Sequence, residues 1–330
     1  MRRILLSTVV LIAVFGLAVG AAAMWFVASF DRDGPLTWKA TVIIRRGAGV
    51  AAIADDLTRA GVISEPWVFR FGVRFLAGGK PLRAGEFVFA PGVSAREAVI
   101  LLQSGKTVIR KLTVAEGLTT QKILTLLNRT EGLSGLVTEV PPEGSLMPET
   151  YHFSFGDSRQ QLIERMRAAM TQVLGELWRD RAPDLPLASS AEALVLASIV
   201  ETETAKPDER ARIAGVFINR LKKKMRLQSD PTVVYGLTEG GSSLGRSLSH
   251  ADLKTPTPYN TYIIDGLPPT PIVNPGRASI MAVVRPAETD EFYFVADGAR
   301  GHAFAKTLSE HNRNVARWRR IKKRGLQTQK

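Results

Sequence analysis

The chain of 330 residues contains no cysteine. Disulfides, cysteine nucleophiles and thiolate metal sites are therefore excluded, and an oxidising, extracytoplasmic compartment poses no difficulty for such a chain. Histidine is also scarce, and its four residues show no short metal-ligand spacing of the His-Glu-x-x-His kind. Although His302 and His311 could approach each other, we predict neither a metal nor any other cofactor.

Charge is absent from Ile4 to Phe30, directly after Arg2 and Arg3. As a helix this run would span about 40 Å, which exceeds the ~30 Å hydrocarbon core of a bilayer. The two arginines predict a cytoplasmic N-terminus and an exported remainder. A cleaved signal peptide with its cleavage site at residues 21–23 is the alternative, but the run is about twice as long as a usual signal-peptide core. We therefore predict an uncleaved single-pass anchor in the inner (plasma) membrane, with the rest of the chain periplasmic or otherwise extracytoplasmic.

Acidic residues are outnumbered, since 31 Asp and Glu stand against 44 Lys and Arg, giving a net charge of +13. Eight basic residues and no acidic ones lie between Arg313 and Lys330, so this tail carries most of the excess. Such a tail is typical of nucleic-acid-binding arms, but an exported protein meets no nucleic acid, and we predict none as a partner. The remaining interpretations are a solvated terminal helix and a surface attracted to anionic lipid or to an anionic wall polymer.

Periodicity and composition predict an α+β chain in successive parts. Between residues 40 and 130 a strand, a glycine turn and a helix recur three times, with the turns at Gly47, Gly92 and Gly117. A mostly helical and then loop-rich part follows. The predicted limits are 1–30 for a cytoplasmic stub and membrane helix, 31–39 for a linker, 40–130 for a small α/β module, 131–145 for a boundary linker rich in Gly, Pro and Glu, 146–325 for a C-terminal domain, and 326–330 for the basic tail end.

An apolar helix that ends in two carboxylates is the most informative segment. It is predicted to begin after Ser189, because Ser189 and Glu192 have the spacing of a capping box. Helical periodicity places Glu203 on the same side as the apolar residues of 195–200, and Glu201 roughly opposite. A carboxyl group among aliphatic side chains is desolvated, which raises its pKa and suits a general acid near neutral pH. The alternative is that Glu203 marks the frayed, exposed end of the helix.

Two later loops combine amide, hydroxyl, carboxylate and aromatic side chains. Aromatic faces that stack on sugar rings, together with amides that bond hydroxyl and N-acetyl groups, are what a glycan-binding cleft needs. The alternative is ordinary turn chemistry, because Asn and Pro favour turns in any case. The predicted substrate-binding residues are Gln228, Ser229, Asp230, Tyr259, Asn260 and Tyr262.

An ordered set of motifs resembles the YceG-like family, the MltG-type endolytic murein transglycosylases. The resemblance covers nearly the whole chain. Two positions depart from the family pattern, Thr270 in place of Gly and Arg300 in place of a Gly-Gly-His run, and both concern loop details. The matching motifs are Pro148-Glu-Thr-Tyr151, Ala197-Ser-Ile-Val-Glu-Thr-Glu-Thr204, Gly215-Val-Phe-Ile-Asn-Arg-Leu221, Leu227-Gln-Ser-Asp-Pro-Thr-Val233, Pro258-Tyr-Asn-Thr-Tyr262, Gly266-Leu-Pro-Pro269, Asn274-Pro-Gly276, Tyr293-Phe-Val295 and Glu310-His-Asn312.

The resemblance implies a LysM-like membrane-proximal module and a lytic domain with lysozyme-like logic. It implies cleavage of the MurNAc–GlcNAc β-1,4 bond of peptidoglycan by a glutamate that precedes Ser or Thr, with 1,6-anhydro-MurNAc ends as product. Both Glu201-Thr202 and Glu203-Thr204 fit that pattern, and the helix-face argument favours Glu203. The family also implies penicillin-binding synthases and the elongation machinery as neighbours. Two alternatives stay open: a water-using muramidase with Asp230 as second carboxylate, and a catalytically silent, glycan-binding scaffold.

Overall fold

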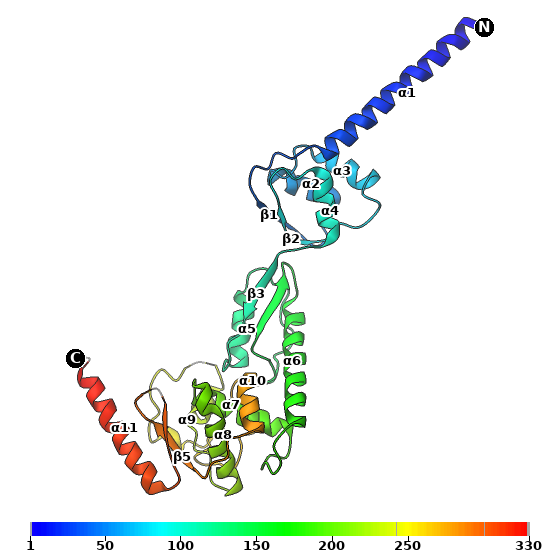
Figure 1. Ribbon diagram of the computed structural model, residues 1–330. Coiled ribbons are helices and arrows are strands. Elements are labelled where there is room, and N and C mark those ends of the chain that lie inside the picture. The colour runs from blue at the N-terminus through cyan, green and yellow to red at the C-terminus, as the bar shows by residue number, and fades with distance from the viewer. Residues whose placement is uncertain (1, 242, 300, 329–330) are drawn as a thin grey trace. The chain divides into compact units, whose positions relative to one another are not determined.

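The computed structural model of the chain describes residues 2–241, 243–299 and 301–328. The chain divides into two compact units. The first, called unit 1, extends to Arg110 and includes His152–Asp157, and unit 2 holds Lys111–Tyr151 and the residues from Ser158 onward. Within the described residues, one helix is long and apolar enough to cross a membrane, as predicted. It forms most of α1 (Arg2–Asp31), at the N-terminal end in Figure 1.

Unit 1 packs three helices against a two-stranded sheet at the end of α1 (Figure 1). The strands are antiparallel, with Ala40 opposite Phe89 and Ile44 opposite Gly85. Alternation places Phe87 and Phe89 inward, and both are fully buried. The elements are β1 (Ala40–Ile44), α2 (Val50–Arg59), α3 (Pro66–Phe75), β2 (Gly85–Phe89) and α4 (Ala95–Ser104).

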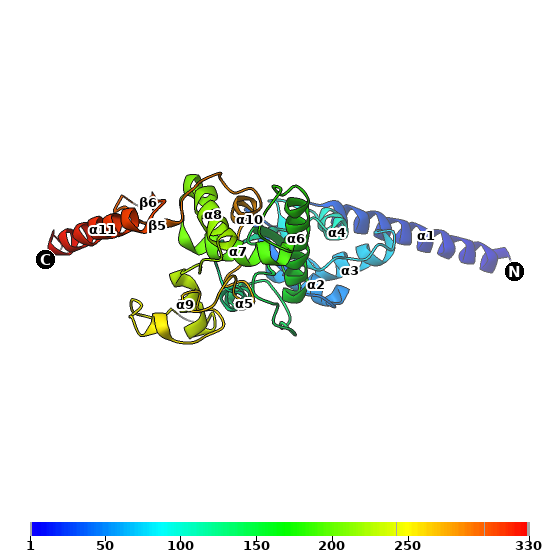
Figure 2. The ribbon, with the colours of Figure 1, turned by 90° about the horizontal axis from the view of Figure 1, so that it is seen from below.

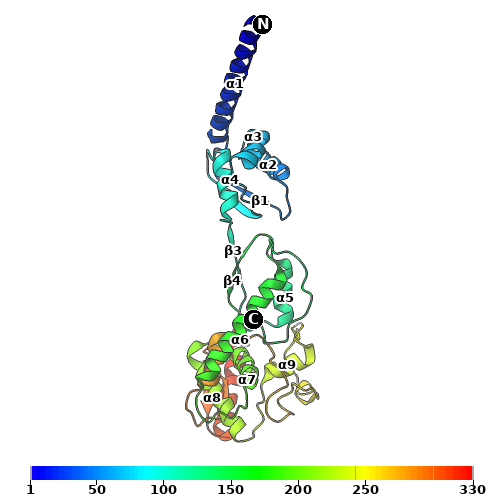
Figure 3. The same ribbon diagram turned by 90° about the vertical axis from the view of Figure 1, so that its right-hand side faces the viewer.

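Unit 2 is mostly helical. Figure 2 shows α7, α8 and α10 side by side with α6 across them, and their apolar side chains form one core cluster. A short two-stranded sheet, β5 with β6, completes it, and a further sheet, β3 with β4 (Figure 3), has residues in both units. The elements are β3 (Ile109–Thr113), α5 (Thr120–Arg129), β4 (Thr150–Ser154), α6 (Arg159–Arg179), α7 (Ser190–Glu203), α8 (Pro207–Lys222), α9 (Asp230–Thr238), η1 (Asp252–Lys254), α10 (Arg277–Val284), β5 (Tyr293–Ala296), β6 (His302–Ala305) and α11 (Leu308–Thr328).

The expected boundary at residues 131–145 does not coincide with the division into compact units, which falls between Arg110 and Lys111. The reason is a buried hydrogen-bond network inside unit 2. The Glu143 carboxylate accepts from the Thr120 backbone N–H at 2.8 Å and from the Asn274 amide at 3.0 Å. This stretch therefore belongs to the folded unit despite its turn-rich composition. As family domains, the predicted limits remain predictions.

Gly215 allows a backbone segment to approach α8 closely. A Cβ at this position would lie 2.5 Å from the Ala287 carbonyl oxygen and 2.9 Å from the Thr289 methyl carbon. The segment is held in place, because the Ala287 N–H donates to the Ala211 carbonyl at 2.9 Å. Gly175, in the middle of α6, instead faces open space.

We expect Gly215→Ala to lower the free energy of unfolding by about 1–3 kcal/mol, because overpacking against backbone outweighs the gain in helix propensity. Gly175→Ala, the matched control, should raise it by roughly 0.5–1 kcal/mol. Denaturant unfolding of the detergent-solubilised chain measures both. Equal shifts in the same direction would contradict the close packing assigned to Gly215.

Candidate active site

Helix α7 carries both candidate carboxylates on its last turn. Its start is confirmed, because the Ser189 side chain accepts from the Glu192 backbone N–H at 3.3 Å. The expected single apolar face is not found, since every residue from Val195 to Val200 is buried. The helix packs against α6, α8, α9 and α10 and is enclosed on all sides. Helix face alone therefore cannot distinguish Glu201 from Glu203, and their partners must.

Glu201 is a compensated carboxylate. Its side chain is 6% exposed and lies 3.7 Å from the Arg210 guanidinium. It also accepts from the Gly276 backbone N–H at 2.9 Å. A cation and a backbone donor therefore replace the water that this buried side chain has lost. Glu201 thus joins α7 to α8 and to the start of α10, and it contacts no pocket-lining group by these bonds.

Glu203 has a different surrounding, because its closest polar partner is a neutral hydroxyl. The Ser229 Oγ donates to Glu203 Oε1 at 2.5 Å. Burial raises the pKa of Glu203 to about 7, and the negative charge of Asp230 acts in the same direction. The Ser229 hydrogen bond and the more distant charges of His302 and Arg220 oppose that rise. Near neutral pH this carboxyl can therefore both donate and accept a proton.

Ser229 is fixed by bonds to two threonines. It is 2% exposed, and its backbone N–H donates to the Thr261 hydroxyl at 2.9 Å. Its carbonyl accepts from the Thr232 hydroxyl at 2.7 Å. The preceding residue, Gln228, adopts a left-handed backbone with φ of 49° and donates to the Thr261 carbonyl at 3.1 Å. The hydroxyl that contacts Glu203 is thus held on a rigid support rather than on a free loop.

Glu203 lines a pocket of about 480 Å³ inside unit 2. At one wall, the Tyr262 hydroxyl donates to Asp230 Oδ1 at 2.6 Å. The pocket is lined by Glu203, Arg220, Leu227, Gln228, Asp230, Tyr262, Tyr293, Phe294, Val295, Ala296, His302, Leu308, His311, Asn312 and Val315. It therefore unites the end of α7 with α8, the 227–230 loop, β5, β6 and α11.

Arg220 supplies the positive charge of the pocket. Its guanidinium donates to the carbonyls of Phe292 at 2.6 Å and Leu227 at 2.6 Å, and desolvation lowers its pKa. Because these acceptors are neutral, its charge acts on Glu203 without the close ion pair that Glu201 makes with Arg210. Arg220 lay inside one of the family-like motifs, but nothing in its local pattern distinguished it from a surface arginine.

Two of the predicted cleft residues lie elsewhere. Asn260 is fully buried and donates to the carbonyls of Leu253 and Thr255, so it holds its own loop closed. The Tyr259 hydroxyl is 2.8 Å from Thr270 Oγ1, and its ring lies edge-on to Tyr235. Neither lines this pocket, and their role in substrate binding remains a prediction. Their place outside the pocket follows from local geometry, because adjacent residues of a turn point in different directions.

The pocket also contains residues that the sequence did not indicate as ligand-binding. The His311 ring stacks on Tyr293 with centroids 5.2 Å apart, and burial lowers its pKa. The His302 Nδ1 is 2.7 Å from Glu209 Oε2. His302 and His311 line the same pocket. Within the described part of the chain, no group of three or more His, Cys, Asp or Glu could hold a metal ion.

The raised pKa of Glu203 should appear in the pH dependence of stability. Between about pH 4.5, the usual value, and pH 7 the folded chain binds the proton more tightly than the unfolded chain, so stability falls as pH rises through this window. The Glu203→Gln side chain cannot ionise. The free energy of unfolding of this variant minus that of the natural chain should therefore increase from pH 4.5 to pH 7, by at most about 3 kcal/mol. Thermal unfolding between pH 4 and 9 measures this.

Ser229→Ala provides the complementary variant. This variant removes a hydrogen bond that favours the charged form of Glu203, so the pKa of Glu203 should rise further. The fall in stability with pH should then extend to higher pH than in the natural chain. A pH-independent difference between Glu203→Gln and the natural chain would contradict the raised pKa.

Comparison with known proteins agrees with this arrangement of elements. A Bacillus subtilis protein named endolytic murein transglycosylase is 31% identical, with 86% of this chain and 85% of the relative covered. A relative of the same name from Streptococcus pneumoniae is 29% identical over 84% of this chain, which spans 58% of that relative's length. A crystal structure of a YceG-like protein from Listeria monocytogenes is 32% identical, with a TM-score of 0.52 over 84% of this chain and 99% of that one.

The model of the YceG-like family matches residues 42–317, which include the pocket and both candidate glutamates. Because this match extends over most of the 330 residues, the chain belongs to the YceG-like family.

Proposed function

We propose that this chain is a membrane-anchored, endolytic lytic transglycosylase that cleaves the MurNAc–GlcNAc β-1,4 bond of peptidoglycan. The observation that carries the proposal is the Glu203 carboxyl, whose pKa near 7 and Ser229 partner suit proton transfer in both directions. The names of the relatives from Bacillus subtilis and Streptococcus pneumoniae, endolytic murein transglycosylase, support the same substrate class.

Protonated Glu203 gives its proton to the glycosidic oxygen as the bond to C1 of MurNAc breaks through an oxocarbenium-like state. The Glu203 carboxylate then takes the proton of the MurNAc 6-hydroxyl while that oxygen bonds to C1. The product is a 1,6-anhydro ring, no water is consumed, and Glu203 regains its proton. The internal hydroxyl is already close to C1, so no second carboxylate is needed to place a nucleophile.

Gln228, Asp230 and Tyr262 would contact the sugar, with Ser229 and Arg220 acting on the protonation of Glu203. Burial raises the pKa of Glu203 most and the Ser229 hydrogen bond lowers it, while Asp230 adds to the rise and Arg220 favours the carboxylate that forms after the first proton transfer. Tyr293 and Asn312, which come from β5 and α11, line the same pocket and would extend the binding surface.

Asp230 favours one second candidate, a muramidase that uses water. It lines the same pocket and would serve as the base that activates the water. Its carboxylate accepts a hydrogen bond from the Tyr262 hydroxyl at 2.6 Å. The two candidates differ in product, because hydrolysis leaves a reducing end and lysis leaves an anhydro end.

The surroundings of the lytic domain form part of the proposal. We propose that α1 anchors the chain in the plasma membrane with Arg2 in the cytoplasm, and that residues 40–130 form a LysM-like module. The catalytic domain would cleave nascent glycan strands with a lysozyme-like acid. It would act beside penicillin-binding synthases and the elongation machinery. Binding and digestion assays on sacculi distinguish three roles. The module could bind glycan, the chain could be a scaffold without catalysis, or the module could be a simple spacer.

We expect Glu203→Gln to lower the digestion of purified sacculi at least ~100-fold while folding is retained, since the amide keeps the shape but cannot donate the proton. Glu201→Gln is the matched control two residues away, and its amide oxygen can still accept from Gly276. It should retain most of the activity. Loss of activity in Glu201→Gln with retention in Glu203→Gln would overturn the assignment.

Mass spectrometry of the soluble products from the natural chain distinguishes the chemistry. Muropeptides that end in 1,6-anhydro-MurNAc are expected. Products that are heavier by one water, with reducing ends, would establish the muramidase instead, and binding to sacculi without release of fragments would establish the scaffold.

The anchor proposal has its own test. Because the apolar run of α1 is long and follows two arginines, the mature chain should keep Met1 or Arg2 at its N-terminus and require detergent for extraction. N-terminal sequencing of the natural protein checks this. An N-terminus at Ala23 or Met24 would make the protein secreted.

A further inference from the structure

Helix α3 exposes a row of aromatic side chains on unit 1. Trp67, Phe71 and Phe75 follow each other at intervals of four residues, and they are 38%, 52% and 65% exposed. The opposite side of the same helix, with Val68 and Phe69, is buried in the core of the unit. Large apolar side chains grouped in this way on a surface indicate a binding partner that covers them.

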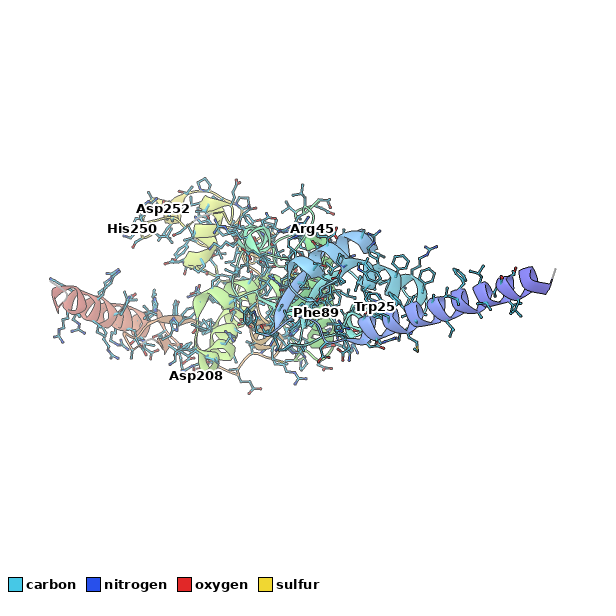
Figure 4. The ribbon with its side chains drawn as sticks, turned by 90° about the horizontal axis from the view of Figure 1, so that it is seen from above. Trp25, Arg45, Phe89, Asp208, His250 and Asp252 are labelled. Atoms are coloured by element: carbon cyan, nitrogen blue, oxygen red, sulfur yellow. The ribbon has the colours of Figure 1, made fainter. Side chains whose placement is uncertain are left out.

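This row is continuous with the apolar surface of α1. The indole rings of Trp25 and Trp67 stack with centroids 5.7 Å apart, and Phe26 lies 6.4 Å from Phe71. Trp25 is 56% exposed and lies where α1 enters the folded part of unit 1 (Figure 4). The aromatic face of α3 therefore begins at the end of the span predicted to cross the membrane.

The two helices are held in this arrangement. Gly72 of α3 packs against Phe30 of α1, and a Cβ at Gly72 would lie 2.2 Å from that ring. Phe30 is 1% exposed, and the next residue, Asp31, forms an ion pair with Arg96 of α4. Because the end of α1 is part of the core of unit 1, the aromatic row has a fixed position relative to α1.

Basic side chains flank the aromatic row. Arg70 and Arg74 are exposed, and the Arg74 guanidinium lies 5.7 Å from the centre of the Phe75 ring. The sequence of α3 contains no acidic residue. Long basic side chains can extend from an apolar surface toward phosphate groups, and aromatic residues concentrate at the depth of the headgroups.

A polar cavity of about 290 Å³ lies at the same junction of α1 and α3. Among its walls are Ser29, Arg32, Ser64 and the indole rings of Trp25 and Trp67. Polar groups thus gather where the apolar span ends, as expected at the level of lipid headgroups.

We propose that α3 is an interfacial helix that docks on the bilayer crossed by α1, with Trp67, Phe71 and Phe75 in the boundary between headgroups and acyl chains and with Arg70 and Arg74 at anionic headgroups. Lipid is the occupant that matches continuity with a membrane span, exposed aromatics and flanking arginines together. The proposal goes beyond the lytic activity and rests on the anchoring of α1 proposed above. Unit 1 would then be attached to the membrane at two sites rather than by a single tether.

The absence of cysteine from the natural sequence makes a direct test possible, because each single cysteine variant of the full chain carries one label. Phe71→Cys and Phe75→Cys, labelled with an environment-sensitive fluorophore, are reconstituted in vesicles that contain anionic phospholipid and brominated lipids of known bromine depth. Both probes should be quenched at a depth of roughly 5–10 Å, the usual depth of interfacial helices.

Two matched positions serve as controls. Leu17→Cys in α1 is 76% exposed in the protein and should be quenched by the deepest bromines. Ile109→Cys is 57% exposed and belongs to unit 1, at the start of β3. Because β3 begins at the end of unit 1 away from α1 (Figure 1), this position should not be quenched. Quenching at position 17 but not at 71 and 75 would overturn the docking of α3 and leave the anchor intact. Lack of quenching at all positions would overturn both, whereas digestion of sacculi by the same variants reports on the lytic proposal independently.

Discussion

The Glu203 carboxyl loses most of its water at the end of an enclosed helix and receives in return a single hydroxyl, that of Ser229. The rest of unit 2 maintains that condition. Helices α8 and α10 close the apolar sides of α7, and the threonines around Ser229 fix the hydroxyl. Burial disfavours the charged form more than the Ser229 hydrogen bond favours it, so packing is the largest cause of the raised pKa that the proposed acid requires.

Glu201 shows how strongly the partner decides the outcome. Both glutamates occupy the last turn of α7, and both carboxyl groups are largely shielded from solvent. The guanidinium of Arg210 and the N–H of Gly276 stabilise its charge, so it acts as a structural link between helices. Arg220, in contrast, binds neutral carbonyls, and its charge reaches Glu203 only through space. Two carboxylates in one turn thereby acquire different chemistry.

The sequence predicted the start of α7 at Ser189 and the apolar N-terminal helix, since local spacing encodes both. Gln228, Asp230 and Tyr262 line the same pocket as Glu203, and their roles as substrate-binding residues remain predictions. Sequence reasoning missed the features that depend on packing between distant parts of the chain. The enclosure of α7 depends on helices from other parts of the chain, and the residues of β5, β6 and α11 reach the pocket from about a hundred positions away. Residues 131–145 as a boundary between family domains remain a prediction, and composition gave no sign that the Asn274 amide donates to Glu143 within unit 2.

The protonation of Glu203 can be measured directly. Carbon-13 labelling of the glutamate side-chain carboxyls, with Glu203→Gln used to assign the signal, gives the titration curve of this one group by NMR in detergent micelles. A midpoint close to pH 7 is the expected result, because burial raises the pKa of Glu203 to about 7. A midpoint near the usual 4.5 would contradict the account, since Glu203 would then be ionised at neutral pH and unable to serve as the acid.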